Sequence, residues 1–280
     1  MCKKTTLILT TLACVYITGV ISVSFEEDTR LTANQAKILT EFRNRVLPIL
    51  PHKYMEENIY LVRWLRARQF DIDGAEKMLL KDLKWRADNN LDTIDDEDWK
   101  VFELEYPVNQ DGLDKQGRPL VQLNFGSEWN IRRASVTGRL SRLARWTYKY
   151  LENGTRRVRK LQSEGKNVTQ FSVIIGMDGF NPVIHTCVRC MSYYFTLVDV
   201  FEEHYNGHID KVHTLDLLEP ARVLIRILLP LLSVNTREAL VFWGTRQKEW
   251  KAGLSKDIDE NQLLQSYGGT LDADNTTFTI

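Results

Sequence analysis

The sequence lacks the short motifs that identify several large classes of enzyme. Its 280 residues contain no Gly-x-Ser-x-Gly elbow, no Walker loop, no Gly-x-Gly-x-x-Gly fingerprint and no His-Glu-x-x-His helix. The chain therefore offers no nucleophile, phosphate-binding loop or zinc site of these kinds. We expect a protein that is not an enzyme and that uses no cofactor, and an enzyme acting on a lipid is the weakest hypothesis.

The sequence contains few glycines, prolines and cysteines, and its net charge is zero. The 15 glycines and 7 prolines exclude collagen-like and low-complexity chains, and four cysteines are too few for a disulfide scaffold. The 37 basic and 37 acidic side chains cancel, which argues against a nucleic-acid partner. Apolar residues make up 43% of the chain, so it can bury a sizeable core.

Residues 1–24 differ from the rest of the chain. Lys3 and Lys4 precede a run of residues, 5–24, that carries no charge. This pattern is typical of a signal peptide cleaved near Ser24 or of a signal anchor, and a buried N-terminal helix is a third interpretation. The first two deliver the folded part to the secretory lumen or outside the cell. Sequons that would be usable there are at Asn153, Asn167 and Asn275.

Apolar residues that recur three and four positions apart predict helices in the first hundred residues. The pattern indicates helices over 33–46 and 56–68, and a capping box at Asp73–Glu76 predicts a third helix that continues to about residue 89. We assign residues 30–92 to an N-terminal helical subdomain. The acidic segment that follows, between Asp88 and Glu105, is predicted to be a solvated face.

The second part of the chain, residues 106–272, alternates strands with helices. Short apolar runs predict strands at 120–125, 171–177, 212–217 and 240–243. Helices are predicted over 136–161 and 187–201, the second apolar on nearly all sides and therefore buried. This alternation predicts an α/β fold with a largely parallel sheet, followed by a short tail, residues 273–280.

Residues 221–232 contain nine aliphatic side chains in twelve positions. They form either a core helix or a lid over an apolar cavity. Moving such side chains into water costs about 1.5 to 3 kcal/mol each, so a lid would open only against another apolar phase, such as a bilayer. The candidate gate residues are Val223, Leu224, Ile227, Leu228 and Leu231.

The long helix of the second part carries basic residues on one side. They are Arg139, Arg142, Lys149, Arg156 and Lys160. They form either a solvated face or a stripe that docks on anionic membranes.

Two further groupings invite a chemical interpretation. The residues His204, His208, Asp210 and His213 could be imagined as a metal site, but Gly207 interrupts the helix that would align them. We favour loop and strand histidines and expect no metal. Cys187 and Cys190 have the spacing of a redox pair. Because they fall inside the apolar helix predicted over 187–201, two packed free thiols are the favoured interpretation.

Several motifs together resemble the CRAL-TRIO family of lipid-binding and lipid-transfer proteins over residues 35–272. The similar segments are 61–71, 114–119, 177–179, 230–244 and 267–270. The animal tocopherol-associated, or supernatant protein factor, branch looks nearest. Members of that branch usually continue into a GOLD-type β-sandwich, which we expect to be absent here. The family is mostly cytosolic, so the N-terminal leader is a departure.

The resemblance implies a helical subdomain followed by a CRAL-TRIO sheet with a gate helix over an apolar pocket. Family members that exchange phosphatidylinositol hold its headgroup with charged residues, whose matching positions here are Gln69, Gly207 and Ala239. Members that bind phosphatidylcholine place hydroxyls where this chain has Val173 and Ile175. The expected cargo is therefore a small hydrophobic lipid of the tocopherol, retinoid or terpenoid class.

Strand alternation places the apolar residues of 171–177 on one face of the sheet. The candidate ligand-binding residues are Val121, Leu123, Phe125, Phe171, Val173, Ile175, Met177, Tyr194, Val198, Phe201, Val212 and Thr214. The same residue types also suit a closed sheet core. The leading hypothesis is a noncatalytic carrier that moves a lipid between membranes. The alternative is a membrane-tethered interaction module that binds anionic lipid or protein through the basic helix.

Overall fold

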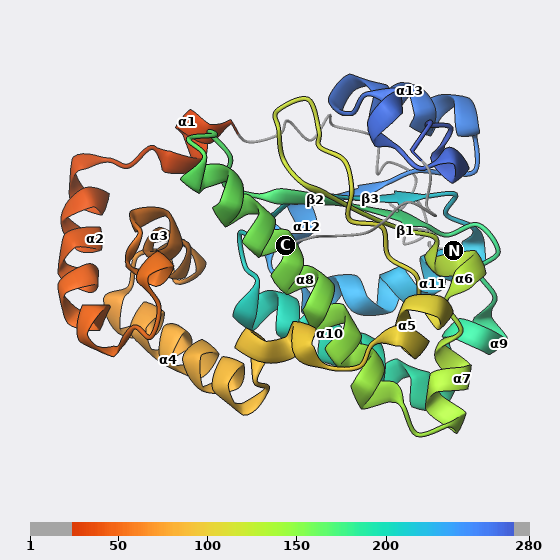
Figure 1. Cartoon of the computed structure of the whole chain (residues 1–280), viewed down its shortest axis with the longest axis horizontal. Coiled ribbons are helices and arrows are strands. Elements are labelled where there is room, and N and C mark those ends of the chain that lie inside the picture. The colour runs from red at the N-terminus through yellow and green to blue at the C-terminus, as the bar shows by residue number, and fades with distance from the viewer. Residues whose placement is uncertain (1–23, 272–280) are drawn as a thin grey trace, which may run out of the picture.

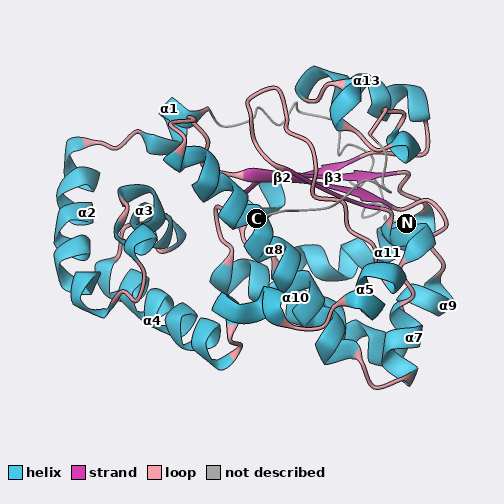
Figure 2. Ribbon diagram, viewed as in Figure 1, coloured by secondary structure: helices cyan, strands magenta, loops and turns pink. Residues whose placement is uncertain are grey.

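Residues 24–271 are described by the computed structural model, in which a helical region is followed by a sheet with helices on both faces (Figure 1 and Figure 2). The leader up to residue 23, the tail 273–280 and the sequon at Asn275 lie outside the described residues. Within 24–271, no helix combines the length and the apolar character needed to cross a bilayer.

The N-terminal helices are α1 Phe25–Thr29, α2 Ala33–Val46, η1 Leu47–Ile49, η2 Lys53–Glu56, α3 Asn58–Ala67, α4 Ile72–Asp88, η3 Leu91–Asp96 and α5 Lys100–Glu105. Helices α2, α3 and α4 form the left part of Figure 1 and have a core of their own, whereas the buried residues of η3 and α5 belong to the core of the sheet region. Phe42 of α2, Leu61 of α3 and Leu79 of α4 are fully buried where these helices meet. The apolar spacing in the sequence therefore reflects a real helix-on-helix core.

The start of α4 differs from the predicted capping box. Asp71 occupies the N-cap position, and no side chain caps the helix there. Asp73 lies inside the first turn and pairs instead with Arg45 of α2, at 2.7 Å. Asp73 thus joins two helices of the N-terminal region rather than starting one.

Four parallel strands form the sheet in the order β1-β2-β3-β4. They are β1 Leu120–Leu123, β2 Phe171–Gly176, β3 Ile209–Leu215 and β4 Leu240–Phe242. Val121 lies opposite Val173, which in turn lies opposite Val212. The predicted strands and the predicted α/β fold are confirmed.

Helices cover both faces of this sheet (Figure 1). The remaining elements are α6 Phe125–Glu128, α7 Ile131–Val136, α8 Leu140–Ser163, α9 Pro182–His185, η4 Val188–Cys190, α10 Met191–His204, α11 Glu219–Leu228, η5 Leu229–Leu231, α12 Val234–Glu238, α13 Gln247–Asp257, η6 Glu260–Gln262 and η7 Gln265–Tyr267. Trp250 and Leu254 of α13 pack with Ile174 on one face. On the other face, α8 packs against β1 and β2, and α10 packs against α8.

Two helices differ from their predicted limits. The basic helix begins at Leu140 rather than near residue 136, because Gly138 adopts a left-handed conformation with φ of 69° between α7 and α8. The helix predicted over 187–201 begins at Met191 and is buried on one side only, since Phe195 is 46% exposed. The apolar composition did not imply burial on all sides, because Phe195, Thr196 and Asp199 form an exposed face of α10.

Two of the contacts that tie the helical region to the sheet region involve His204. His204 of α10 lies 2.9 Å from the carboxylate of Asp82 of α4, and both side chains are buried. Trp85 of α4 stacks on the same imidazole, with ring centroids 3.9 Å apart. These contacts hold α4 against α10, which also borders the site described next.

Candidate functional site

A cavity of about 1040 Å³ lies between the sheet and helices α10 and α11. Alternate residues of β2 and β3 form its floor, among them Val173, Ile175, Val212 and Thr214. Leu197 of α10 faces them from the opposite side. A cavity of this volume with apolar walls is large enough for a small hydrophobic molecule.

Most of the predicted ligand-binding residues line this cavity. They are Leu123, Phe125, Val173, Ile175, Met177, Tyr194, Val198, Phe201, Val212 and Thr214. Their contact with a ligand stays a prediction. The sequence analysis missed aromatic residues that line the same space, namely Trp129, Tyr150, Tyr193 and Tyr205. No strand periodicity points to these four, because they come from helices and from the turns beside them.

Val121 and Phe171 are the exceptions, and placing them in the cavity was wrong. Both side chains are fully buried in the core of the sheet region. The ring of Phe171 lies so close to Gly154 of α8 that a Cβ there would be 3.0 Å from it. Val121 and Phe171 both lie on the same face of the sheet as Val173, as strand alternation predicts, but α8 covers this part of the face.

The predicted gate residues divide between the two sides of α11. Leu224 and Leu228 line the cavity, together with Ile225, which the prediction omitted. Val223 and Ile227 are 51% and 48% exposed, and Leu231 of η5 is 50% exposed. These exposed gate residues do not line the cavity, so α11 and η5 present apolar side chains to the cavity and to solvent.

Arg63 introduces polar groups at one end of the cavity. Its guanidinium donates hydrogen bonds to the Thr169 carbonyl oxygen and to Nδ1 of His208, the latter at 3.2 Å. Burial lowers the pKa of Arg63 to about 10. Arg63 belongs to the 61–71 motif, but nothing in the sequence pattern indicated that its side chain reaches the cavity.

Gln69, Gly207 and Ala239 occupy the positions at which family members that exchange phosphatidylinositol hold its headgroup. Gly207 and Ala239 line the cavity, whereas Gln69 does not. Gln69 adopts a left-handed conformation, with φ of 52°, in the turn after α3. Gly207 and Ala239 therefore give the cavity wall no charge, and Gln69 lies away from the cavity.

The cavity continues around β4, which is an edge strand. Its lining there includes Lys211 and His213, which alternate with the floor residues along β3. Nζ of Lys211 pairs with a carboxylate oxygen of Asp257 at 2.9 Å. The edge of the site is therefore polar, and its floor is apolar.

The grouping imagined as a metal site is dispersed among other partners. His204 pairs with Asp82, His208 accepts from Arg63, and Nε1 of Trp243 donates to Nδ1 of His213 at 3.3 Å. Asp210 forms an ion pair with Arg118. In residues 24–271, no group of three or more His, Cys, Asp or Glu side chains is arranged to hold a metal ion.

The basic stripe of α8 faces the acidic segment rather than open solvent. Arg139 pairs with Glu105 at 2.8 Å, and Lys149 pairs with Asp95 at 3.2 Å. The remaining contacts join Arg142 to Glu97 and Arg156 to Asp95, while Lys160 is exposed.

The prediction of a solvated acidic face is therefore wrong for Asp95, Glu97 and Glu105, which pair with the basic stripe, whereas Asp92, Asp96, Asp98 and Glu103 are exposed. Docking of the basic stripe on membranes stays a prediction. Helix η3 packs against α8, and Arg142 lies over the ring of Trp99 at 3.7 Å from its centroid. The two charge patterns in the sequence complement each other in space. Most of the stripe is neutralised by its own chain.

The fold and cavity define an α/β binding protein with a deep apolar site beneath a helix. Residues 105–269 match the CRAL/TRIO domain family. The chain belongs to this family, whose members are lipid-binding and lipid-transfer proteins, and the predicted family is confirmed. Assignment to the tocopherol-associated branch stays a prediction.

Curated relatives are about one-quarter identical to this chain over the residues that align. Patellin-4 of Arabidopsis thaliana is 25% identical over 234 residues, which cover 83% of this chain and 42% of Patellin-4. Protein real-time of Anopheles gambiae is 26% identical over 215 residues, which cover 75% of this chain and 31% of the relative. The chain thus spans less than half the length of either relative.

A solved structure shows the same fold. The crystal structure of Sfh5 aligns with a TM-score of 0.64 over 86% of this chain and 96% of Sfh5. The two sequences are 11% identical, so this likeness concerns the fold alone.

Proposed function

We propose that this protein is a noncatalytic carrier that binds one small, neutral, hydrophobic lipid and moves it between membranes. The tocopherol, retinoid or terpenoid class fits best. The observation that carries the proposal is the cavity of about 1040 Å³, whose floor is formed by Val173, Ile175 and Val212. Membership of a lipid-binding family supports the same conclusion.

The chemistry of the cavity favours a neutral cargo over a phospholipid. An apolar molecule gains about 25 cal/mol for each Å² of its surface removed from water. A phosphate against Val173 and Ile175 would keep unpaired oxygens in an apolar space, at a cost of several kcal/mol. Two cations of the lining have carboxylate partners of their own: Arg66 pairs with Asp28 at 2.8 Å, and Lys211 pairs with Asp257.

The two apolar sides of α11 support a gating step at a membrane. Leu224 and Leu228 close the cavity, while Val223 and Ile227 face outward. Beside the outer face lies Val188, which is 92% exposed and borders the same hollow as Val223. In this proposal the outward side chains enter the bilayer first. The inner side of α11 then leaves the cavity without passing through water.

The alternative of an interaction module that binds through the basic helix has less support. Arg139, Arg142, Lys149 and Arg156 already pair with carboxylates of the segment before β1. An anionic lipid or protein would have to replace these partners.

We further propose that the folded part lies in the secretory lumen or outside the cell. The charge-free run after Lys3 and Lys4 supports this location. The disulfide between Cys187 and Cys190 is also expected in an oxidising compartment. A signal anchor in place of a cleaved signal peptide would put the folded part in the same compartment.

Vesicle transfer tests the carrier proposal. Purified protein should transfer α-tocopherol between vesicles and should transfer little phosphatidylinositol. Ile175→Lys should abolish transfer, because it places a charge in the cavity floor, and the variant should still unfold cooperatively. Val136→Lys is the matched control, since Val136 is 70% exposed on α7. Equal transfer of phosphatidylinositol, or normal transfer by Ile175→Lys, would contradict the proposal.

A further inference from the structure

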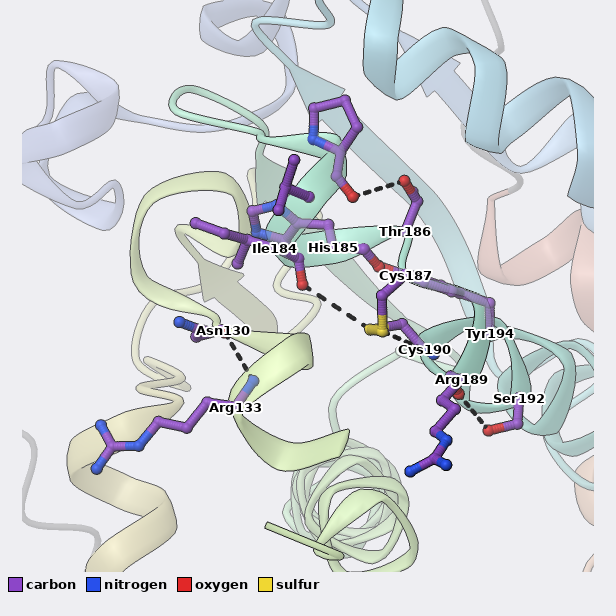
Figure 3. The surroundings of a disulfide bond; sticks show 12 residues. Asn130, Arg133, Ile184, His185, Thr186, Cys187, Arg189, Cys190, Ser192 and Tyr194 are labelled. Atoms are coloured by element: carbon purple, nitrogen blue, oxygen red, sulfur yellow. Dashed lines mark hydrogen bonds between the residues drawn. A yellow bond between two sulfur atoms is a disulfide. The ribbon is translucent and has the colours of Figure 1, made fainter. Parts of the chain in front are cut away.

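The cysteine pair of the described chain lies at the start of a helix. Cys187 and Cys190 form a disulfide, so the interpretation as two packed free thiols is wrong. Cys187 precedes the short helix η4, and Cys190 immediately precedes Met191, where the fourteen-residue helix α10 begins (Figure 3). The two cysteines therefore do not lie inside a buried helix, which was the reason for favouring packed free thiols over a redox pair.

From this arrangement we infer a thiol–disulfide exchange site. Cys187 is the sulfur that meets an incoming thiol, and Cys190 is the sulfur released from the disulfide. The inference does not depend on the lipid-carrier proposal, because none of its steps involves a ligand in the cavity.

The two sulfurs differ in their access to solvent. Cys190 is fully buried, whereas Cys187 is half-buried and is followed by Val188, which is 92% exposed. A hollow of about 540 Å³ borders the residues on either side of Cys187, namely Thr186 and Val188. A soluble thiol can therefore approach Cys187 but not Cys190.

The backbone around the pair favours a thiolate at Cys187. The backbone N–H of Cys190 donates to Sγ of Cys187 across 3.1 Å. Both residues lie at the N-terminal end of α10, where the helix carries a partial positive charge. A thiolate at such a position is stabilised, and the thiolate is the reactive form of cysteine.

The buried sulfur has a partner for its reduced form. Sγ of Cys190 lies 3.9 Å from the carbonyl oxygen of Ile184 (Figure 3). Once it is released and protonated, the Cys190 thiol can donate a hydrogen bond to this oxygen. The surroundings of the two cysteines therefore suit different roles.

The exchange has two steps, each of which balances. A thiolate of the reductant attacks Sγ of Cys187, the Cys187–Cys190 bond breaks, and Cys190 leaves as a thiolate that takes up a proton. A second thiol of the reductant then attacks the reductant sulfur of this mixed disulfide and releases Cys187. The reductant is oxidised to a disulfide, and the protein gains two electrons and two protons.

Single-cysteine variants of the full chain test these roles. All samples carry Cys2→Ser and Cys14→Ser, so that only the pair under study can react. With oxidised glutathione as the probe, Cys190→Ser should form a mixed disulfide at Cys187 at least about tenfold faster than Cys187→Ser forms one at Cys190, because only Cys187 is accessible. Mass spectrometry measures both rates.

Two controls keep the test decisive. In denaturant both variants should react at similar rates, which shows that the difference depends on the fold. The parent protein should be reduced by glutathione without loss of its near-ultraviolet circular dichroism. Equal or reversed rates in the folded variants, or reduction only after unfolding, would overturn the assignment.

Discussion

Arg86 of α4 forms a two-point ion pair with Glu152 of α8. The guanidinium nitrogens lie 2.9 and 2.8 Å from the two carboxylate oxygens, and Glu152 is 1% exposed. The hydroxyl of Tyr205 donates a third hydrogen bond to this carboxylate at 2.6 Å. One buried charge pair therefore connects the N-terminal helices to the helix that covers the sheet.

Breaking this pair should be costly. Arg86→Met leaves the Glu152 carboxylate buried without its cation, and we expect a loss of about 3 to 5 kcal/mol in the free energy of unfolding. Lys84→Met is the control, because Lys84 and its partner Asp88 are both exposed and such pairs contribute less than about 1 kcal/mol. Urea unfolding measures both. Similar small losses for the two variants would contradict the structural role of the pair.

The buried His213 and the half-buried His208 should make the fold sensitive to acid. Burial, reinforced by the charge of Lys211, lowers the pKa of His213 from 6.5 to about 4. Burial and the charge of Arg63 lower the pKa of His208 well below 6.5. Between these folded values and 6.5, the unfolded chain binds protons that the folded chain does not. Stability should therefore be full above pH 6.5 and should fall as the pH drops.

The expected slope for each histidine is at most about 1.4 kcal/mol per pH unit. Urea unfolding at several pH values above about 5 measures this slope, and His213→Gln should reduce it because one titrating group is removed. A stability that stays constant or rises on acidification over this range would disprove the assignment.

Phe171 and Phe201 should respond differently to the same truncation. Phe171→Ala removes a ring packed in the sheet core, so we expect a loss of about 3 to 5 kcal/mol. Phe201 lines the cavity and is half-buried, so Phe201→Ala should cost less than half as much and should mainly weaken lipid binding. Thermal unfolding and a tocopherol-binding titration separate the two effects. An equal loss of stability would place Phe201 in the core as well.

The sequons should differ in use. Asn167 is exposed in the loop after α8, whereas Asn153 is half-buried within α8 and hydrogen-bonds to Gln110. Expressed in animal cells, the protein should carry a glycosidase-sensitive glycan that Asn167→Gln removes and Asn153→Gln does not. Gel mobility reports both, with Asn275→Gln run alongside. A protein without any glycan that remains accessible to protease outside microsomes would refute the secretory location.

Membrane association should depend on α11 rather than on α8. Ile227→Asp places a charge on the outward face of α11, and we expect vesicle binding to weaken about tenfold or more. Val136→Asp is the matched control at another exposed apolar position. Sedimentation with anionic and neutral vesicles measures binding. If Arg142→Gln with Arg156→Gln weakened binding more than Ile227→Asp, the α8 stripe would be the docking surface after all.

The sequence by itself determined the elements and their arrangement. Apolar residues at helical spacing produced α2 and α3, and short apolar runs produced the four strands, because these patterns record which side chains must leave water. Alternation along β2 also placed Val173 and Ile175 on the same side. The limits of α4, by contrast, could not be read from its capping motif, since Asp73 pairs with Arg45 across to another helix.

Only the tertiary structure decided the environment of the candidate sites. Strand alternation placed Phe171 on the same face as Val173, but only the packing of α8 enclosed Phe171 in the core while Val173 lines the cavity. The basic stripe of α8 and the acidic segment were separate features until folding brought Arg139 onto Glu105. Cys187 and Cys190 form a disulfide ahead of α10, which begins at Met191 and not at Cys187 as the apolar pattern indicated. Local sequence patterns predict which side chains are buried. Contacts between segments that are distant in the sequence decide which groups a buried or charged side chain meets.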